Sequence, residues 1–380
     1  MKKVIVLGST GSIGTNTLDI IRRHPDKFKV LGLSAFSNAE LLSEQIKEFK
    51  PRYISIFDKN RYKKIKARGA SKIFAGQEGL LKLASNKCDI LVMGISGFGA
   101  LRPLVAALGK AKRLLLANKE AIISAGSILA KKMRSSSTRI FPVDSEAWAV
   151  SNLLEGTSLN HINSIYITAS GGPFFRKSRN QMRKAGIKQV LKHPVWKMGK
   201  RISVDSATLM NKGFEVIEIH RLFEIPVEKI KVLVHPQSVI HAFLEKNNGS
   251  LLSSLFSADM KIPIGASLGS PTNHLYVRNL DLSKLKGLDF FKPDYKKFPL
   301  LKLAYFVAKS GRSFPAVLVA SDEEAVSLFL EGKISFLEIS KIIEKVIASH
   351  RAKDLNGLED VFLWQAWAKD KVRQIALKKG

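Results

Sequence analysis

Lys3-Val-Ile-Val-Leu-Gly-Ser-Thr-Gly-Ser-Ile-Gly14 decides how the first part of this 380-residue chain folds. Its apolar start predicts a strand from Lys3 to Leu7, and the glycine-rich turn leads into a helix from about Gly14 to Arg23. Glycines permit a tight turn and a close approach to a pyrophosphate, which the unpaired amides at the start of the helix bind. An ordinary strand-to-helix turn is the alternative interpretation. The expected nucleotide contacts are Gly8, Thr10, Gly11, Ser12 and Ile13.

Strand and helix patterns continue to alternate after this turn. Val30 to Ser34 predicts a second strand, and Glu40 to Phe49 predicts a second helix. Because such alternation is typical of a parallel sheet, we expect an α/β fold with a Rossmann-like, doubly wound parallel sheet over residues 1–149. Further strands are expected at Tyr53–Phe57, Ile73–Ala75, Ile90–Met93, Leu114–Ala117 and Arg139–Val143.

The pattern changes after residue 150. Strands are expected at Ile165–Thr168, Lys231–Val234 and Leu251–Phe256, with one helix over Ala207–Phe223. This mixture predicts a central α+β catalytic domain over residues 150–279. A linker, 280–299, then leads to a C-terminal helical domain, 300–380.

The helical domain shows two capping-box pairs, Ser321 with Glu324 and Ser335 with Glu338, each of which predicts the start of a helix. After the second pair, apolar residues recur at helical spacing and predict one buried stripe. The stripe comprises Ile339, Ile342, Ile343, Val346 and Ile347.

The formal net charge of +30 is the most unusual global property of the chain. Alone it would suggest a polyanionic partner such as a nucleic acid. However, the basic residues are spread along the whole chain, and the densest run, Lys59 to Arg68, is typical of a solvated helix. We therefore expect no nucleic-acid partner. A basic surface also attracts phosphorylated small molecules, so the charge does not discriminate between these ligands.

The single cysteine, Cys88, cannot form an internal disulfide, which fits a reducing compartment and makes the cytoplasm the default location. Nothing near it suggests an activated thiol, so we expect it to pack in the core. The best candidate for a membrane segment, Ile90 to Leu108, is interrupted by glycines, an arginine and a proline, so no membrane span is expected. His235 and His241 are more typical of packing than of a metal site.

The end of the second predicted strand bears on the choice of cofactor. An NAD enzyme usually carries Asp or Glu there to bond the ribose 2′-hydroxyl, whereas this chain reads Ser34-Ala-Phe-Ser-Asn38. No carboxylate would repel a 2′-phosphate, and Ser37 and Asn38 offer hydrogen-bond donors to it. NADPH is therefore favoured over NADH, with a plain loop as the alternative.

Acidic residues suggest a metal site. Asp144 and Glu146 follow the strand that ends at Val143, at the sheet edge where α/β proteins place ligands, although Asp144 alone would more simply cap the next helix. In a second polar segment, Asn211 and Glu215 share one helix face. Asp144, Glu146 and Glu215 would form an oxygen site for Mg²⁺ or Mn²⁺. A solvated face with a Lys212–Glu215 pair is the alternative.

The segment His193-Pro-Val-Trp-Lys-Met-Gly199 is punctuated by proline and glycine, which is typical of a loop. The indole of Trp196 would be exposed unless it covers something. We interpret His193, Trp196 and Met198 as parts of a lid that excludes water from a reaction site. A structural loop with a packed tryptophan is the alternative.

Seven segments, in order and spacing, resemble the 1-deoxy-D-xylulose 5-phosphate reductoisomerase family along nearly the whole chain. They are GSTGSIG from Gly8, LLLANKEAI around Lys119, PVDSE around Asp144, TASGGPF at Ser170, KHPVWKMG at His193, ISVDSATLMNKG at Ser206 and HPQSVIH at His235. The resemblance implies a homodimer that rearranges and reduces 1-deoxy-D-xylulose 5-phosphate to 2-C-methyl-D-erythritol 4-phosphate. NADPH and a divalent metal ion are the implied cofactors, and isoprenoid precursor biosynthesis outside the mevalonate route is the implied process.

The resemblance also implies roles for individual residues. The metal ligands fall on Asp144, Glu146 and Glu215. The substrate contacts fall on Ser145, Ser170, His193, Ser206, Asn211, Lys212 and Glu215, and further cofactor contacts on Asn118, Glu120 and Gly199. Catalytic roles fall on Lys119, Glu146, His193 and Lys212. Lys119 would orient or protonate a substrate oxygen. The hydroxyl, amide and ammonium donors in this set suit a phosphate group.

The chain departs from the family pattern at a few positions. Ala147 and Trp148 follow PVDSE where relatives usually continue with His-Ser, Phe36 stands where a glycine is common, and Asp322 stands where an Asn is usual. Two rival functions are another NADP-dependent reductase of a small phosphorylated or semialdehyde substrate, and a non-catalytic NADP-binding regulator. A semialdehyde enzyme needs a nucleophilic cysteine, which Cys88 serves poorly. A regulator leaves the three carboxylates unexplained.

Overall fold

The computed structural model describes residues 1–66, 72–196, 198–269, 277 and 279–377. The chain divides into two compact units. The first comprises Met1–Ala121, Lys131–Trp148 and Asp259–Val277, and the second comprises Ile122–Ala130, Ala149–Ala258 and Arg278–Gly380. The sequence did not indicate that a segment after residue 258 returns to the first unit. The four ranges predicted above stay a proposal.

The first unit contains, in its described residues, seven parallel strands in the order β4-β3-β2-β1-β5-β6-β7. They are β1 (Lys2–Leu7), β2 (Phe28–Ala35), β3 (Tyr53–Ile56), β4 (Lys72–Ala75), β5 (Cys88–Met93), β6 (Ala111–Leu116) and β7 (Arg139–Pro142). The order reverses at β1, which pairs with both β2 and β5. Doubly wound sheets bind ligands at this switch point. The predicted Rossmann-like parallel sheet is confirmed.

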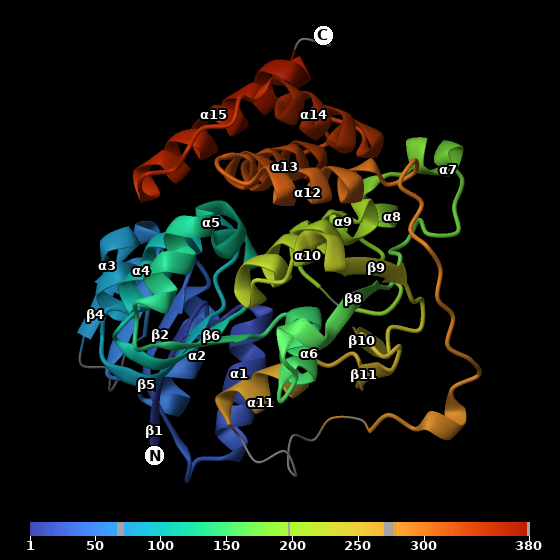
Figure 1. Ribbon diagram of the computed structural model, residues 1–380. Coiled ribbons are helices and arrows are strands. Elements are labelled where there is room, and N and C mark those ends of the chain that lie inside the picture. The colour runs from blue at the N-terminus through green and yellow to red at the C-terminus, as the bar shows by residue number, and fades with distance from the viewer. Residues whose placement is uncertain (67–71, 197, 270–276, 278, 378–380) are drawn as a thin grey trace. The chain divides into compact units, whose positions relative to one another are not determined.

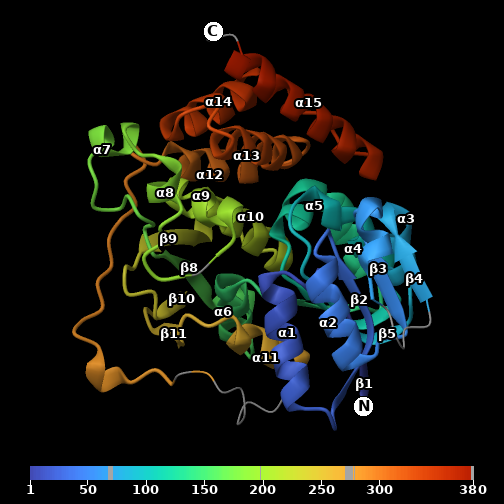
Figure 2. The same cartoon turned by 180° about the vertical axis from the view of Figure 1, so that it is seen from behind.

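Helices cover both faces of this sheet. In Figure 1, α3 (Gly76–Ala84) and α4 (Leu101–Ala107) lie in front of the strands. Figure 2 shows α1 (Ser12–Arg23) and α2 (Ala39–Phe49) on the opposite face. The returning helix α11 (Lys261–Leu268) packs beside α1, and its Ile264 and Leu268 join the apolar core of strands and helices. Each fully buried side chain of this size stabilises the fold by about 1.5–3 kcal/mol.

Two helices cross the division of the chain. They are α5 (Lys119–Arg134), whose middle part Ile122–Ala130 belongs to the second unit, and α6 (Ser145–Leu154), which begins in the first unit and continues in the second. The basic run predicted as a helix from Lys59 is a short 3₁₀ helix, Lys59–Lys64, without buried residues, and its end at Arg68 lies outside the described residues. No helix in the described part of the chain is both long and apolar enough to span a bilayer.

The second unit has, within the described ranges, a mixed four-stranded sheet in the order β11-β10-β8-β9. The strands are β8 (Ile162–Ala169), β9 (Ile230–Val234), β10 (Ile240–Lys246) and β11 (Leu251–Leu255). β8 pairs with β9 in parallel, and the other pairs are antiparallel. The helices are α7 (Arg179–Arg183), α8 (Ile187–Val190), α9 (Lys200–Thr208), α10 (Met210–Phe223), α12 (Pro299–Ser310), α13 (Phe314–Leu330), α14 (Phe336–Ser349) and α15 (Leu358–Leu377).

The helix predicted around Ala207–Phe223 corresponds to α10, which ends at Phe223 but begins at Met210, because Ala207 and Thr208 belong to the separate helix α9. Leu209 lies between them with a left-handed backbone, φ 60°. The hydroxyl of Thr208 accepts a hydrogen bond from the amide of Met210 at 3.3 Å, so it takes up one of the amides exposed by the break. Apolar residues recur without interruption through both helices, and periodicity therefore did not reveal the break.

The C-terminal helices confirm one capping box and contradict the other. Ser335 and Glu338 form a complete capping box at the start of α14, and the predicted isoleucine and valine stripe of α14 is buried. Ser321, in contrast, is buried inside α13, which begins seven residues earlier at Phe314 with a proline in its first turn. A proline in the first turn is a strong start signal, and it outweighs the Ser321–Glu324 pattern.

Candidate active site

The glycine-rich turn after β1 has the geometry of a nucleotide-binding turn. Gly8 has φ +81°, and a Cβ atom there would lie 2.7 Å from the carbonyl oxygen of Gly94. Gly11 precedes α1 without any side-chain cap, and Gly11 and Ser12 are exposed, while Thr10 and Ile13 are half-buried. The first amides of α1 therefore point out of the turn without a capping side chain, which suits an anion.

The end of β2 supports the same turn and carries no acid. The hydroxyl of Ser34 accepts a hydrogen bond from the Gly8 amide at 3.0 Å. Asn38 caps α2 by accepting from the Leu41 amide at 3.0 Å, and this cap does not use its Nδ2 group; Ser37 is half-buried beside it. Phe36 is 68% exposed and stacks on Phe57 with 5.1 Å between ring centroids. Sequence reasoning missed Ser34 and Gly94, although both stand at the carboxyl ends of central strands.

Asn118 has a structural task at the start of α5. Its Nδ2 group donates to the carbonyl oxygens of Ile95 and Gly97, both at 2.9 Å, and its Oδ1 accepts from the Ala121 amide at 2.7 Å. The side chain is buried. It therefore ties the loop after β5 to the helix that carries Lys119 and Glu120.

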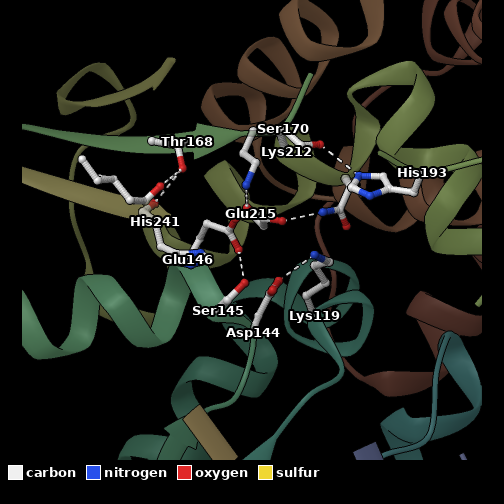
Figure 3. A network of polar contacts seen from close by, with 12 residues as sticks. Lys119, Asp144, Ser145, Glu146, Thr168, Ser170, His193, Lys212, Glu215 and His241 are labelled. Carbon is white, nitrogen blue, oxygen red and sulfur yellow. Dashed lines mark hydrogen bonds and ion pairs between the residues drawn. The ribbon is translucent and has the colours of Figure 1, made fainter. Parts of the chain in front are cut away.

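The first unit brings four of the predicted site residues together (Figure 3). Lys119 Nζ lies 2.6 Å from Asp144 Oδ2, and Ser145 Oγ donates to Glu146 Oε2 at 2.6 Å. The carboxylate of Asp144 thus faces an ammonium group at the amino end of α6. The contact follows from the sheet, because β6 and β7 are parallel neighbours and their carboxyl ends lie at one edge. Ala147 is fully buried and Trp148 half-buried in α6.

The second unit buries a charged pair on α10. Glu215 is completely buried, and Lys212, 4% exposed, donates a hydrogen bond to it. Asn211 Nδ2 donates to the other carboxylate oxygen at 2.5 Å. The predicted shared face of Asn211 and Glu215 is confirmed. A buried carboxylate is costly unless it is paired and hydrogen-bonded, and both conditions are met here.

Ser170 and His193 form a second contact in this unit (Figure 3). His193 Nδ1 accepts hydrogen bonds from the amides of Val195 and Trp196, at 3.2 and 2.8 Å. Nδ1 therefore carries no proton, and the neutral ring donates from Nε2 to Ser170 Oγ at 2.9 Å. Burial lowers the pKa of His193 to about 4, which keeps the ring neutral. The Ser170 hydroxyl hydrogen can then be donated to an anion.

The turn after Ser170 packs against the end of α9. Gly172 has φ +64°, and a Cβ atom there would lie 2.8 Å from the carbonyl oxygen of Ser206. The amide of Gly172 donates to Ser170 Oγ at 3.2 Å. The second unit thus places Ser170 and Ser206 on backbone segments in close contact. Sequence reasoning missed Gly172, although the Gly-Gly pair after a strand was a visible signal.

The predicted lid segment covers a histidine of β10. Trp196 is half-buried, and its ring meets His241 edge-on with 6.2 Å between centroids. Met198 is half-buried, and the exposed Gly199 precedes α9; Lys197 lies outside the described residues.

His235, His241 and Cys88 are buried and serve packing, as predicted. His241 also stacks on Phe256 at 3.8 Å, and His235 stacks on Phe290 at 4.7 Å. Cys88 is buried, and burial raises the pKa of its thiol to about 12, so it is not a nucleophile at neutral pH.

Comparison with known families finds matches to nearly every part of the chain. Three family models match in succession: 1-deoxy-D-xylulose 5-phosphate reductoisomerase over residues 4–126, the C-terminal domain of the same family over residues 140–223, and the DXP reductoisomerase C-terminal domain over residues 255–371. A 1-deoxy-D-xylulose 5-phosphate reductoisomerase of Thermodesulfovibrio yellowstonii is 46% identical over 372 residues, which cover 97% of this chain and 98% of the relative.

Solved structures give the same result. The reductoisomerase of Zymomonas mobilis in complex with NADPH superposes with a TM-score of 0.92 at 39% identity, and 99% of each chain is covered. A DOX-P reductoisomerase in complex with NADPH, fosmidomycin and magnesium superposes with a TM-score of 0.93 at 36% identity, with complete coverage of both chains.

Proposed function

This chain belongs to the 1-deoxy-D-xylulose 5-phosphate reductoisomerase family. We therefore propose that the polar side chains around Lys119 in the first unit and those around Glu215 in the second carry out the reaction of that family. The chain is an NADPH-dependent oxidoreductase that converts 1-deoxy-D-xylulose 5-phosphate to 2-C-methyl-D-erythritol 4-phosphate with a divalent metal ion. The observation that carries this proposal is the match over the full length of the chain, with each acid, base and hydroxyl of the proposed site present.

The proposed metal ligands are Asp144, Glu146 and Glu215. Asp144 and Glu146 belong to the first unit and Glu215 to the second, so their binding of one ion is part of the proposal. A set of carboxylate oxygens suits Mg²⁺ or Mn²⁺, and magnesium is present in a solved relative. When bound, the ion polarises a carbonyl group and stabilises negative charge on oxygen while the carbon skeleton rearranges.

The proposed substrate contacts combine neutral and cationic donors. They are Ser145, Ser170, His193, Ser206, Asn211, Lys212 and Glu215. Ser170 supports this role because His193 and the Gly172 amide already donate to its oxygen, so its own hydrogen is available to a phosphate oxygen. Lys212 adds the positive charge that a phosphate requires.

The proposed catalytic residues are Lys119, Glu146, His193 and Lys212. Lys119 holds a proton at Nζ, 2.6 Å from Asp144, and would donate it to, or orient, a substrate oxygen. His193, Trp196 and Met198 would form the lid, and their closure would exclude water.

The proposed NADPH contacts lie around the glycine-rich turn and the start of α5. They are Gly8, Thr10, Gly11, Ser12, Ile13, Ser37, Asn38, Asn118, Glu120 and Gly199. The absence of a carboxylate between Ser34 and Asn38 supports the preference for the 2′-phosphate. NADPH supplies the hydride that reduces the rearranged aldehyde.

Three further parts of the proposal concern the whole chain. We infer the domain ranges 1–149, 150–279, 280–299 and 300–380, a cytoplasmic location, and a homodimer with a small sugar phosphate as its other partner. The single cysteine supports the reducing compartment. Light scattering tests the dimer, which would have about twice the mass of one chain, 42.1 kDa.

A coupled assay tests the function. Purified protein, 1-deoxy-D-xylulose 5-phosphate and Mg²⁺ or Mn²⁺ should oxidise NADPH, and EDTA should abolish the signal. NADH should be a poorer cofactor. Equal efficiency with both cofactors would contradict the inference that the lack of a carboxylate at the end of β2 favours NADPH. Lack of any NADPH oxidation with pure substrate and metal would favour one of the rival functions.

A further inference from the structure

A group of buried charges joins α9 to the C-terminal helices of the second unit. Asp322 of α13 is completely buried, and Asp205 of α9 is buried and interacts with it directly. Arg201, one turn before Asp205, lies with Nη2 3.7 Å from Asp322 Oδ2 and with Nε 3.9 Å from Asp205 Oδ2. None of the metal, substrate or cofactor residues proposed above belongs to this group.

Arg201 lies closer to Glu323 than to Asp322. Glu323 forms ion pairs with Arg201 Nη1 at 2.8 Å and with Lys369 of α15 at 2.9 Å. The next acid along α13, Glu324, has its own partner, Arg373, at 2.7 Å. Both oxygens of Asp322 are buried without a hydrogen-bond donor from the described part of the chain. Asp322 is thus a completely buried acid beside Asp205, with the guanidinium group of Arg201 near both.

One retained proton would stabilise this pair of buried carboxyl groups. Two ionised carboxylates in contact away from water repel each other, whereas a protonated and an ionised carboxyl group form a hydrogen bond. Burial and the neighbouring Asp205 raise the pKa of Asp322 well above its ordinary range, and Arg201 opposes this shift. Asp322 has no solvent access, so water does not stabilise its ionised form.

We propose that Asp322 is protonated at neutral pH, donates its hydrogen to a carboxylate oxygen of Asp205, and so acts as a positioning residue for α9. The proposal rests on the proposed function, because α9 carries Ser206, one of the proposed phosphate contacts. The charged groups that act on Asp322 are Arg201 and Asp205 of α9 and Glu323 of its own helix.

The packing of α9 connects this proton to substrate binding. Ser206 directly follows Asp205, and its backbone contacts the turn that holds Ser170, at the position of Gly172. Repulsion between ionised Asp205 and Asp322 would displace α9 and, with it, two proposed phosphate donors. We therefore expect loss of the proton to weaken substrate binding more than it slows the chemical step.

The variant Asp322→Asn tests the proposal, because its amide donates to Asp205 but does not titrate. In the wild type, KM for the sugar phosphate should rise about tenfold as the pH increases above neutral, the change that corresponds to one pKa unit of coupling. In Asp322→Asn, KM should match the wild-type value at neutral pH and lack this rise, while kcat stays similar in both. Asp370→Asn, an exposed acid of α15, is the matched control and should behave as the wild type.

A second measurement does not need the substrate. If Asp322 retains its proton on folding, the wild type should lose free energy of unfolding relative to Asp322→Asn as the pH rises above the ordinary range of an aspartate. Denaturant unfolding at several pH values measures this difference. Coincident KM profiles together with a pH-independent difference in unfolding would overturn the proposal. Absence of activity in all variants would instead contradict the proposed function. The unfolding measurement would still show whether Asp322 retains its proton in the folded chain.

Discussion

Glu215 and Lys212 illustrate how single residues mark the site. Each is almost without solvent access, and each carries a charge. Replacing a buried ion pair by apolar side chains of similar size often leaves a protein equally or more stable. A helix that only had to pack would therefore gain nothing from this pair, and its presence on α10 supports the proposed role of both residues in ligand binding.

Glu215→Gln tests the proposed ligand at this scale. The amide retains the shape of the side chain but loses the negative charge that binds a cation, so turnover should fall by about 100-fold or more. NADPH affinity should be unchanged, because the proposed cofactor turn is in the other unit. Fluorescence titration with NADPH and steady-state turnover measure the two effects. Glu228→Gln, an exposed acid paired with Lys309, is the control, and turnover of Glu215→Gln equal to that control would contradict the assignment.

His193 should titrate far below its ordinary value of 6.5. Burial lowers its pKa to about 4, and the amides of Val195 and Trp196 hold Nδ1 unprotonated. The unfolded chain binds a proton near pH 6.5 and the folded chain does not, so this group costs stability as the pH falls from 6.5 toward 4. Nitrogen-detected NMR should show a neutral Nε2–H tautomer at pH 5.5. A titration midpoint near 6.5, or a proton on Nδ1, would refute the described geometry.

At the scale of elements, local patterns were predictable and their interruptions were not. The strand, glycine turn and helix at the N-terminus follow from neighbouring residues, and the structure agrees with them within two residues at each end. The break at Leu209 depends on one left-handed residue that apolar periodicity does not encode. Strand β10 was not predicted either, because its pairing with β8 and β11 depends on residues far away in the sequence.

The same distinction applies to the candidate site. The residue types of Lys119 and Asp144 were visible in the sequence, but their contact required the adjacency of β6 and β7. The contact between the turn at Gly172 and the backbone of Ser206 joins elements more than thirty residues apart, and no sequence pattern in either segment predicts it.

Gly172→Ala tests this contact between elements. A residue with a Cβ atom costs about 1–2 kcal/mol in a left-handed backbone, and the 2.8 Å approach to the Ser206 oxygen adds to that cost. Free energy of unfolding should therefore fall, and KM for the sugar phosphate should rise because Ser170 and Ser206 separate. Gly186→Ala is the matched control, since nothing lies within 4 Å of its added Cβ atom. Equal KM values for the two variants would mean that the turn does not position phosphate donors.

At the scale of the whole molecule, the proposed machinery is shared between the two units. The first contributes the glycine turn, Lys119, Ser145 and two carboxylates, and the second contributes Glu215, Lys212, Ser170 and Ser206. Folding of either unit alone would leave the proposed metal with an incomplete set of ligands. The whole chain has a net charge of +30, which creates a positive potential that attracts anions before any contact forms.

The charge of the whole molecule leads to a prediction about salt. Both the sugar phosphate and NADPH are anions, and attraction by a chain of charge +30 should accelerate their encounter. Added KCl screens this attraction, because the Debye length falls to about 10 Å at 0.1 M salt. We expect kcat/KM to decrease by about tenfold as KCl increases from low to physiological concentration, with kcat little changed. Sucrose at equal osmolarity is the control. If kcat/KM does not change with KCl concentration while KM changes in Glu215→Gln, substrate capture depends on the local charges of α10 and not on the net charge of the chain.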